Sequence, residues 1–214
     1  MARGMIGETV MSFELIDNLF QVFVLFTAMI VSLVMFVKYR DRLLVILAFA
    51  YACFCMGTLY YVLYLAIIGD VPQVFYVAEI SWLASYLFYA SVILLRLEKT
   101  KVGFSLPSLI MASLVIAAII LLRIFGPSYF MVILLALTVG GIVYLALYRI
   151  HRRMKFLQFD VCMLVCVALQ IMLYGVSGFV KDYKVFNIYF MIDIMLTCAF
   201  VTLLPLIVRE VRAK

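Results

Sequence analysis

The chain has 214 residues, of which 69% are hydrophobic and 13% are charged, and its formal net charge is +6. A water-soluble domain carries about 45–50% apolar and about 25% charged residues. No soluble fold of this length hides so much apolar surface, so the composition excludes a soluble globular protein and indicates an integral membrane protein.

Seven apolar stretches follow one another along the chain. Each is long enough to cross a bilayer, which takes roughly 20 mostly apolar residues. In chain order they are Leu19–Val37, Leu43–Ile68, Val74–Leu95, Phe104–Leu122, Ser128–Tyr148, Leu157–Val180 and Val185–Val208. The runs are too long for barrel strands and lack their alternating period. Because the connections are short, we predict one polytopic domain over residues 1–214, an all-α bundle of seven transmembrane helices.

Positive charge collects on one side of these spans. Thirteen of the 17 Lys and Arg residues follow the first, third, fifth and seventh spans, as Arg96 and Arg149 do. Cytoplasmic loops are enriched in Lys and Arg. We therefore predict a multi-pass protein of the cell membrane with its N-terminus outside and its C-terminus cytoplasmic. Contact of these loops with anionic membrane lipids explains the net charge, and no nucleic-acid partner is expected.

The cysteines and the histidine give no support for a cofactor. All five Cys lie inside predicted spans, away from the outer loops where an oxidising compartment would pair them, so we predict no disulfide and assign them to packing. The single histidine, His151, lies in an inner loop. Haem ligation by histidines within the spans is therefore unavailable, and we expect no cofactor and no metal.

Two patterns resemble catalytic motifs. Residues 175–178 read Gly-Val-Ser-Gly, which resembles the G-x-S-G signature of rhomboid proteases, but that chemistry needs a His base beside the Ser and no span contains one. Asp160 and Asp193 lie in different halves of the bilayer, roughly 10 Å or more apart in depth, too far for an aspartyl-protease dyad. We expect no catalytic site, and we expect Asp160 to pair with the basic loop at 152–155.

Glu79 is the strongest candidate for a functional residue. It lies five residues into the third span, about 8 Å along the helix axis. An ionisable group at that depth normally faces the bundle interior or a water-filled cavity. Trp82 and Tyr86 continue its helix face at positions i+3 and i+7, so we predict that this face points inward. The alternative is a structural carboxyl, protonated or paired with a basic residue of the outer side: Arg123, Lys181 or Lys184.

Further polar and aromatic residues lie in the same outer half. Tyr60 and Tyr61 are near the outer end of the second span, and Asn187 and Asp193 are in the outer half of the seventh. Together with the face of Glu79, they predict a ligand-binding pocket that opens to the outside.

An internal repeat would relate the two ends of the chain. A shift of 114 residues without gaps lays spans one to three on spans five to seven and pairs Glu79 with Asp193 and Tyr60 with Tyr174. A true repeat implies a 3+1+3 architecture, with the fourth span as an inverting linker and a site at the repeat interface. The alternative is that hydropathy alone aligns the helices.

Two resemblances suggest functions. Seven spans with the N-terminus outside resemble the architecture of SWEET-type sugar transporters and related vitamin transporters, although the one Pro-Gln dipeptide, at 72–73, lies in an outer loop. Residues 72–86, PQVFYVAEISWLASY, resemble the aromatic-rich, acid-bearing third helix of compact seven-span input domains of bacterial sensory proteins. Only residues 209–214 follow the last span, so a sensor of this form would need a separate cytoplasmic partner or would be a fragment.

We therefore expect a sensor or receptor-like module that binds a small or lipidic ligand from the outer side and acts with a cytoplasmic or membrane protein partner. The alternative is a small-solute transporter of 3+1+3 architecture. An assembly subunit and a membrane enzyme such as a lipid hydrolase stay open.

Overall fold

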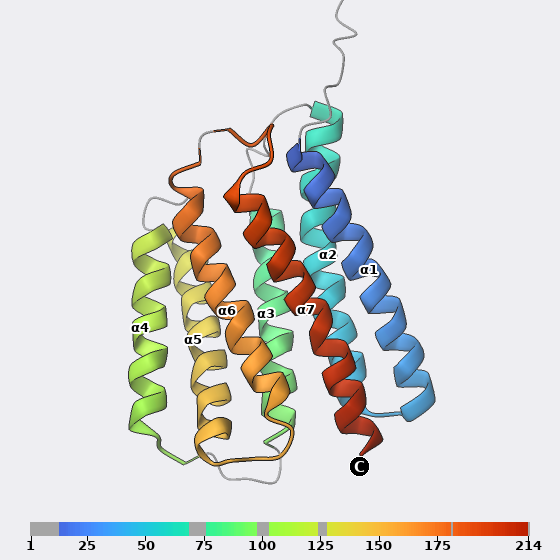
Figure 1. The fold of residues 1–214 in the computed structure, drawn as a ribbon, viewed down its shortest axis with the longest axis vertical. Helices are drawn as coiled ribbons and strands as arrows, with labels where there is room; N and C mark the ends of the chain where they lie inside the picture. The colour runs from blue at the N-terminus through green and yellow to red at the C-terminus, as the bar shows by residue number, and fades with distance from the viewer. Residues whose placement is uncertain (1–12, 69–75, 98–102, 124–127, 181, 214) are drawn as a thin grey trace, which may run out of the picture.

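The computed structural model of the chain describes residues 13–68, 76–97, 103–123, 128–180 and 182–213, which form seven α-helices and no strand (Figure 1). The helices are α1 (Phe13–Tyr39), α2 (Arg42–Ile68), α3 (Tyr76–Leu95), α4 (Leu106–Arg123), α5 (Tyr129–His151), α6 (Gln158–Ser177) and α7 (Ile188–Arg212). By length and composition, all seven could cross a membrane. The predicted all-helical architecture is confirmed, and the seven apolar helices indicate a multi-pass membrane protein.

Helix boundaries depart from the predicted spans where polar side chains cap or extend a helix. α1 begins at Phe13, six residues before the predicted Leu19, because the polar side chains of its first turns are buried against other helices. α5 and α7 begin one residue after a capping side chain: Ser128 accepts from Met131 N at 3.4 Å, and Asn187 accepts from Tyr189 N at 2.9 Å. The predicted start of the third span, Val74, lies outside the described residues.

The distribution of side chains is that of a protein in a bilayer. Large apolar side chains cover the outward faces, as Phe23 (72% exposed) does on α1 and Leu121 (69% exposed) does on α4. Polar and charged side chains are buried between the helices, among them Asp17, Asp160 and Asp193. Lipid is an apolar solvent, so ionisable groups face the bundle interior and apolar groups face outward.

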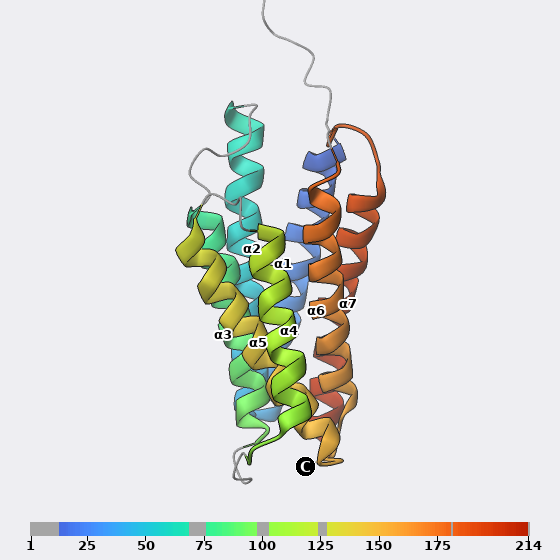
Figure 2. The same cartoon turned by 90° about the vertical axis from the view of Figure 1, so that its left-hand side faces the viewer.

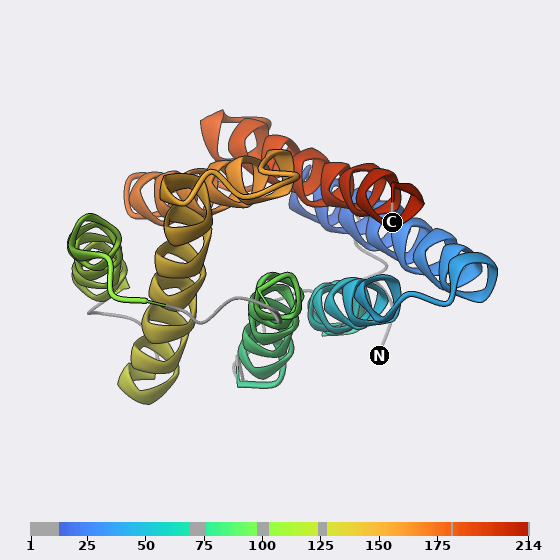
Figure 3. The ribbon, with the colours of Figure 1, turned by 90° about the horizontal axis from the view of Figure 1, so that it is seen from below.

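Six helices form a closed ring in the order α1, α2, α3, α5, α6, α7, seen along the bundle in Figure 3. α4 lies outside the ring against α5 and α6, and it stands in the foreground of Figure 2. α4 approaches α5 closely at Gly140, where an added Cβ would lie 2.5 Å from Ile116 Cγ1. We call the end at which α1, α3, α5 and α7 begin, uppermost in Figure 1, the upper end of the bundle.

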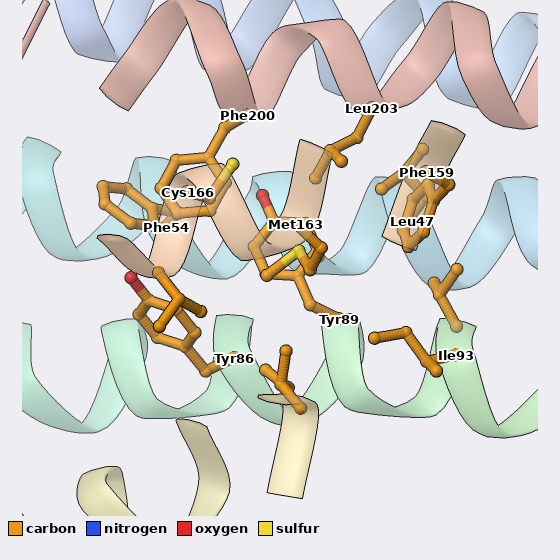
Figure 4. Packing of buried hydrophobic residues seen from close by; sticks show 14 of the residues in the cluster. Leu47, Phe54, Tyr86, Tyr89, Ile93, Phe159, Met163, Cys166, Phe200 and Leu203 are labelled. Atoms are coloured by element: carbon orange, nitrogen blue, oxygen red, sulfur yellow. The ribbon is translucent and has the colours of Figure 1, made fainter. Parts of the chain in front are cut away.

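An aromatic layer fills the middle of the ring. It consists of Tyr51, Phe54, Tyr86, Tyr89 and Phe200, four of which are labelled in Figure 4. Tyr89 and Phe200 stack with ring centroids 5.1 Å apart, and Tyr86 meets Phe200 edge-on at 6.1 Å. Tyr51 donates a hydrogen bond to Phe200 O at 2.8 Å. Aromatic rings in such contacts pack densely, so the layer separates the upper and lower halves of the interior.

Below the aromatic layer lies a buried ion-pair network of Arg96, Arg149, Asp160 and Glu210. Arg96 contacts Asp160 at 2.9 Å and Glu210 at 2.8 Å, and Arg149 contacts Asp160 at 3.1 Å. The side chains of Arg96 and Asp160 are 0% exposed. Two positive and two negative groups make the network neutral, as burial in a low-dielectric interior requires.

This network corrects the sequence interpretation of Asp160. The sequence predicts that it pairs with the basic loop at 152–155, but Asp160 pairs with Arg96, the residue after α3, and with Arg149 of α5. Arg152 and Arg153 are exposed. Asp160 is in the first turn of α6, where it is buried inside the bundle.

Candidate functional site

A cavity of about 590 Å³ occupies the upper half of the bundle, and all seven helices contribute to its walls. It extends from Ser177 and Tyr183 near the upper end to Phe54 and Tyr86, whose rings belong to the aromatic layer and form its floor. Small-molecule sites usually have volumes of about 300–1,000 Å³ and combine apolar walls with a few polar groups. This cavity has both properties.

Glu79 and Arg123 form an ion pair in the cavity wall. Arg123 Nη2 lies 3.0 Å from Glu79 Oε1, and the guanidinium lies 4.9 Å from the centre of the Tyr174 ring. The side chain of Arg123 is 22% exposed and that of Glu79 is 7% exposed. Arg123 is the last residue of α4, where a cation is favoured by the helix dipole. Through this residue the helix outside the ring contributes to the cavity.

Glu79 lies inside the bundle with Trp82 and Tyr86, as the helix periodicity predicts, and all three line the cavity. The pairing with Arg123 that we considered as an alternative is also present. Lys181 lies outside the described residues, and Lys184 is exposed. Glu79 Oε2 has no hydrogen-bond partner among the described residues. One oxygen of the carboxylate is thus paired and the other is not.

A second buried polar group lies between α1, α2 and α7. Gln21 Nε2 donates to Asp193 Oδ1 at 3.0 Å and to Thr197 Oγ1 at 3.1 Å, and it receives a hydrogen bond at Oε1 from Thr58 at 3.0 Å. The side chain of Asp17 lies within hydrogen-bonding reach of Asp193. Asp193 and Gln21 line the cavity.

Asp17 and Asp193 form a buried carboxyl pair. Asp17 is 4% exposed and Asp193 is 8% exposed, and neither forms an ion pair with a described Lys or Arg. Two adjacent carboxyl groups in a low-dielectric interior do not both ionise, because the two charges repel each other. The partner of Asp193 is thus neither Asp160 nor another predicted site residue but Asp17, which precedes the apolar run of α1. The spacing of Asp17 and Gln21 by one helical turn is the signal that could have found it.

Tyrosines form the upper wall. Tyr61 donates to Glu14 Oε1 at 2.8 Å, and both residues line the cavity. Tyr183 and Tyr189 meet edge-on with ring centroids 5.2 Å apart. Burial raises the pKa of Tyr183, which lies in the connection before α7, so its phenol stays neutral. Glu14 was not among the predicted site residues.

Two predicted site residues lie apart from the cavity. Tyr60 is absent from its walls and packs against Tyr64 at a ring distance of 6.2 Å. Successive helical residues are about 100° apart around the axis, so Tyr60 cannot share the direction of Tyr61. Asn187 caps α7, and its Nδ2 donates to Asp182 O at 2.9 Å. The predicted seventh span begins at Val185, but α7 begins at Ile188, so Asn187 precedes the helix.

The residues that resemble catalytic groups have local partners. Ser177 lines the cavity, but its hydroxyl donates to Tyr174 O at 2.9 Å. His151 is at the opposite end of the bundle, where its Nδ1 lies 3.1 Å from Leu147 O. All five cysteines are free thiols. Within the described residues, no group of three His, Cys, Asp or Glu side chains is arranged to hold a metal ion.

No family model matches the chain, and neither the curated proteins nor the solved structures contain a match to it. The cavity and its polar groups are therefore interpreted from their own geometry.

Proposed function

We propose that the protein is a membrane sensor or receptor-like module that binds a small or lipidic ligand in the cavity from the outer side. The cavity reaches the upper end of the bundle, and it is closed beneath by the aromatic layer and the buried ion-pair network. This closed floor is the observation that carries the proposal, because a site that retains its ligand needs an entrance on one side only.

The orientation that we propose follows from charge. Arg96, Arg149 and Arg153 belong to the lower end, whereas the upper end has only Arg123 and Lys184 among the described basic residues. Positively charged ends of membrane helices face the cytoplasm. The cavity then opens to the outside of the cell membrane, and the lower basic residues contact anionic lipid headgroups.

A cytoplasmic protein partner would receive the signal through α7. This helix extends from the cavity residue Asp193 to Arg212 at the lower end, with Pro205 inside it. Arg209 and Arg212 are exposed there, and Glu210 joins the ion-pair network. A shift of α7 on ligand binding would therefore also move its exposed lower end, which a separate partner can contact. Helix shifts of about 1–2 Å are a known form of such signalling.

The proposal is tested by thermal unfolding of the purified protein in nanodiscs. The unfolding is measured with a panel of candidate ligands that contains amines, carboxylates, zwitterions and lysophospholipids. We expect at least one class to raise the midpoint temperature, since a ligand that binds only the folded state stabilises it. Leu135→Phe, which fills the cavity from α5, should remove the effect. A panel without any stabilising class would overturn the proposed binding function.

The second candidate, a small-solute transporter of 3+1+3 architecture, is favoured by contacts across the ring. α3 and α7 face each other, and residues 114 positions apart meet there. Arg96 contacts Glu210 at 2.8 Å, and Tyr86 contacts Phe200 at 6.1 Å between ring centroids. A two-fold axis between α3 and α7 would place equivalent residues together in this way.

The ring order is also the one that a parallel repeat requires, because α1, α2 and α3 are followed by α5, α6 and α7 while α4 stays outside. Superposition of α1–α3 on α5–α7 in the 114-residue register remains a prediction. Solute uptake into proteoliposomes would distinguish the candidates. A transporter moves a cavity ligand across the bilayer, and a sensor binds it without flux.

A further inference from the structure

The charges in the cavity walls are unequal. Among the residues that the structure describes, three carboxyl groups line it, those of Glu14, Glu79 and Asp193, and Arg123 is the one cationic side chain. Two of the carboxyl groups accept hydrogen bonds from neutral donors, Glu14 from the Tyr61 hydroxyl and Asp193 from the Gln21 amide. Glu79 alone is held by the cation.

Glu79 lacks one partner. Its Oε1 accepts from Arg123 at 3.0 Å, and its Oε2 has no hydrogen-bond partner among the described residues. The residue is nevertheless buried, with only 8% of its surface exposed. A buried carboxylate oxygen is normally bonded. The missing group must be a donor, because an ionised carboxylate only accepts.

The surrounding walls favour a positive donor with an apolar body. Tyr174 already holds the Arg123 guanidinium 4.9 Å from its ring centre, and Trp82 and Tyr86 present further aromatic surface to the cavity. Aromatic faces attract cations. Aliphatic side chains also line the cavity, those of Leu135 and Leu196 among them.

Other ligand classes fit these groups less well. An anion would compete with Glu79 for Arg123 and leave the carboxylate buried without its cation, which is costly. A neutral ligand can donate to Oε2 but leaves the excess of carboxyl groups uncompensated. A primary ammonium supplies both the positive charge and three N–H donors.

Resting on the ligand-binding function proposed above, we infer that the cavity takes an amphipathic organic ammonium ion. The N–H groups of the ammonium ion bind Glu79 Oε2, and the apolar body of the ion lies against Leu135 and Leu196.

The test uses three probes of nearly equal shape and different charge: 2-phenylethylamine, 2-phenylethanol and 3-phenylpropionate. The readout is the fluorescence of Trp82, the single tryptophan of the chain and a lining residue of the cavity. In nanodiscs at neutral pH, the amine should give a saturable change with a Kd about tenfold or more below that of the alcohol, a step worth about 1.4 kcal/mol. The carboxylate should bind most weakly.

The matched variants locate the amine. Glu79→Gln should reduce amine binding to the level of the alcohol, whereas Asp182→Asn, which removes an exposed carboxylate at the same end, should leave it unchanged. The wild-type comparison of the three probes remains decisive if Glu79→Gln does not fold.

Three outcomes would overturn the inference. The alcohol or the carboxylate could bind as tightly as the amine, or Glu79→Gln could keep the amine preference. The third outcome separates the inference from the proposed function: if a lysophospholipid or another panel class stabilises the protein and the amine does not bind, the ammonium assignment fails and the binding function stands. If no panel compound binds, both fail.

Discussion

Replacing Asp160 by Asn would leave two buried guanidinium groups facing a single carboxylate. In the folded protein Asp160 accepts from Arg96 at 2.9 Å and from Arg149 at 3.1 Å, and its side chain is 0% exposed. The substitution keeps the shape of the side chain and removes its charge. The network then carries a net positive charge in a low-dielectric interior.

Breaking a buried ion pair by removing one partner costs about 3–5 kcal/mol. A loss of about 4 kcal/mol lowers the ratio of folded to unfolded protein roughly a thousandfold. Unfolding in bicelles, followed by Trp82 fluorescence, measures this change. The matched control is Asp182→Asn, whose carboxylate is exposed and should contribute less than about 1 kcal/mol.

A double variant separates charge from shape. Asp160→Asn combined with Arg149→Met leaves Arg96 paired with Glu210, so the network is again neutral, and most of the lost stability should return. The reasoning is refuted if Asp160→Asn alone lies within about 0.5 kcal/mol of the wild type, the range of surface substitutions. It is also refuted if the double variant loses more unfolding free energy than the two single variants lose together.

Three further predictions address packing, the carboxyl pair and topology. Gly140→Ala should destabilise the protein by about 1–3 kcal/mol in the same unfolding assay, because its Cβ would lie 2.5 Å from a side-chain carbon of α4, whereas Gly141→Ala meets nothing within 4 Å and should be neutral; equal effects would contradict the close α4–α5 contact. Asp17→Asn should change stability by less than about 1 kcal/mol, since the amide keeps the shape and can donate a hydrogen bond to Asp193, and a larger loss would show that the pair depends on charge. Reporter fusions should read cytoplasmic at Arg153 and external at Lys184, and an external reading at Arg153 would remove the proposed orientation.

Hydropathy was sufficient to predict the helices because a bilayer imposes both their length and their outward-facing composition. It failed at the start of α1. Gln21 is buried against α7 through hydrogen bonds to residues more than 170 positions away, and Asp17 is buried one turn before it, but a local window counts both only as polar. The start of α7 was misplaced for a related reason, because the cap residue Asn187 follows an apolar stretch that is not helical.

The inward face of Glu79 could be predicted because helix periodicity places Trp82 and Tyr86 beside it. Its partner could only be narrowed to a set of basic residues, since the choice of Arg123 depends on how α4 packs outside the ring. The network of Arg96, Asp160 and Glu210 could not be predicted at all. It joins the ends of α3, α6 and α7, and no local pattern encodes the closure of the bundle.

The most direct test of a ligand site is a titration followed by Trp82 fluorescence. The titrant is the panel compound that gives the largest stabilisation. Trp82 lines the cavity, and Leu135→Phe occupies the same space from α5. A ligand bound in the cavity should give a saturable change in the wild type that is absent in Leu135→Phe. A response that rises linearly with concentration, or one that is equal in both proteins, would contradict a binding site in this cavity.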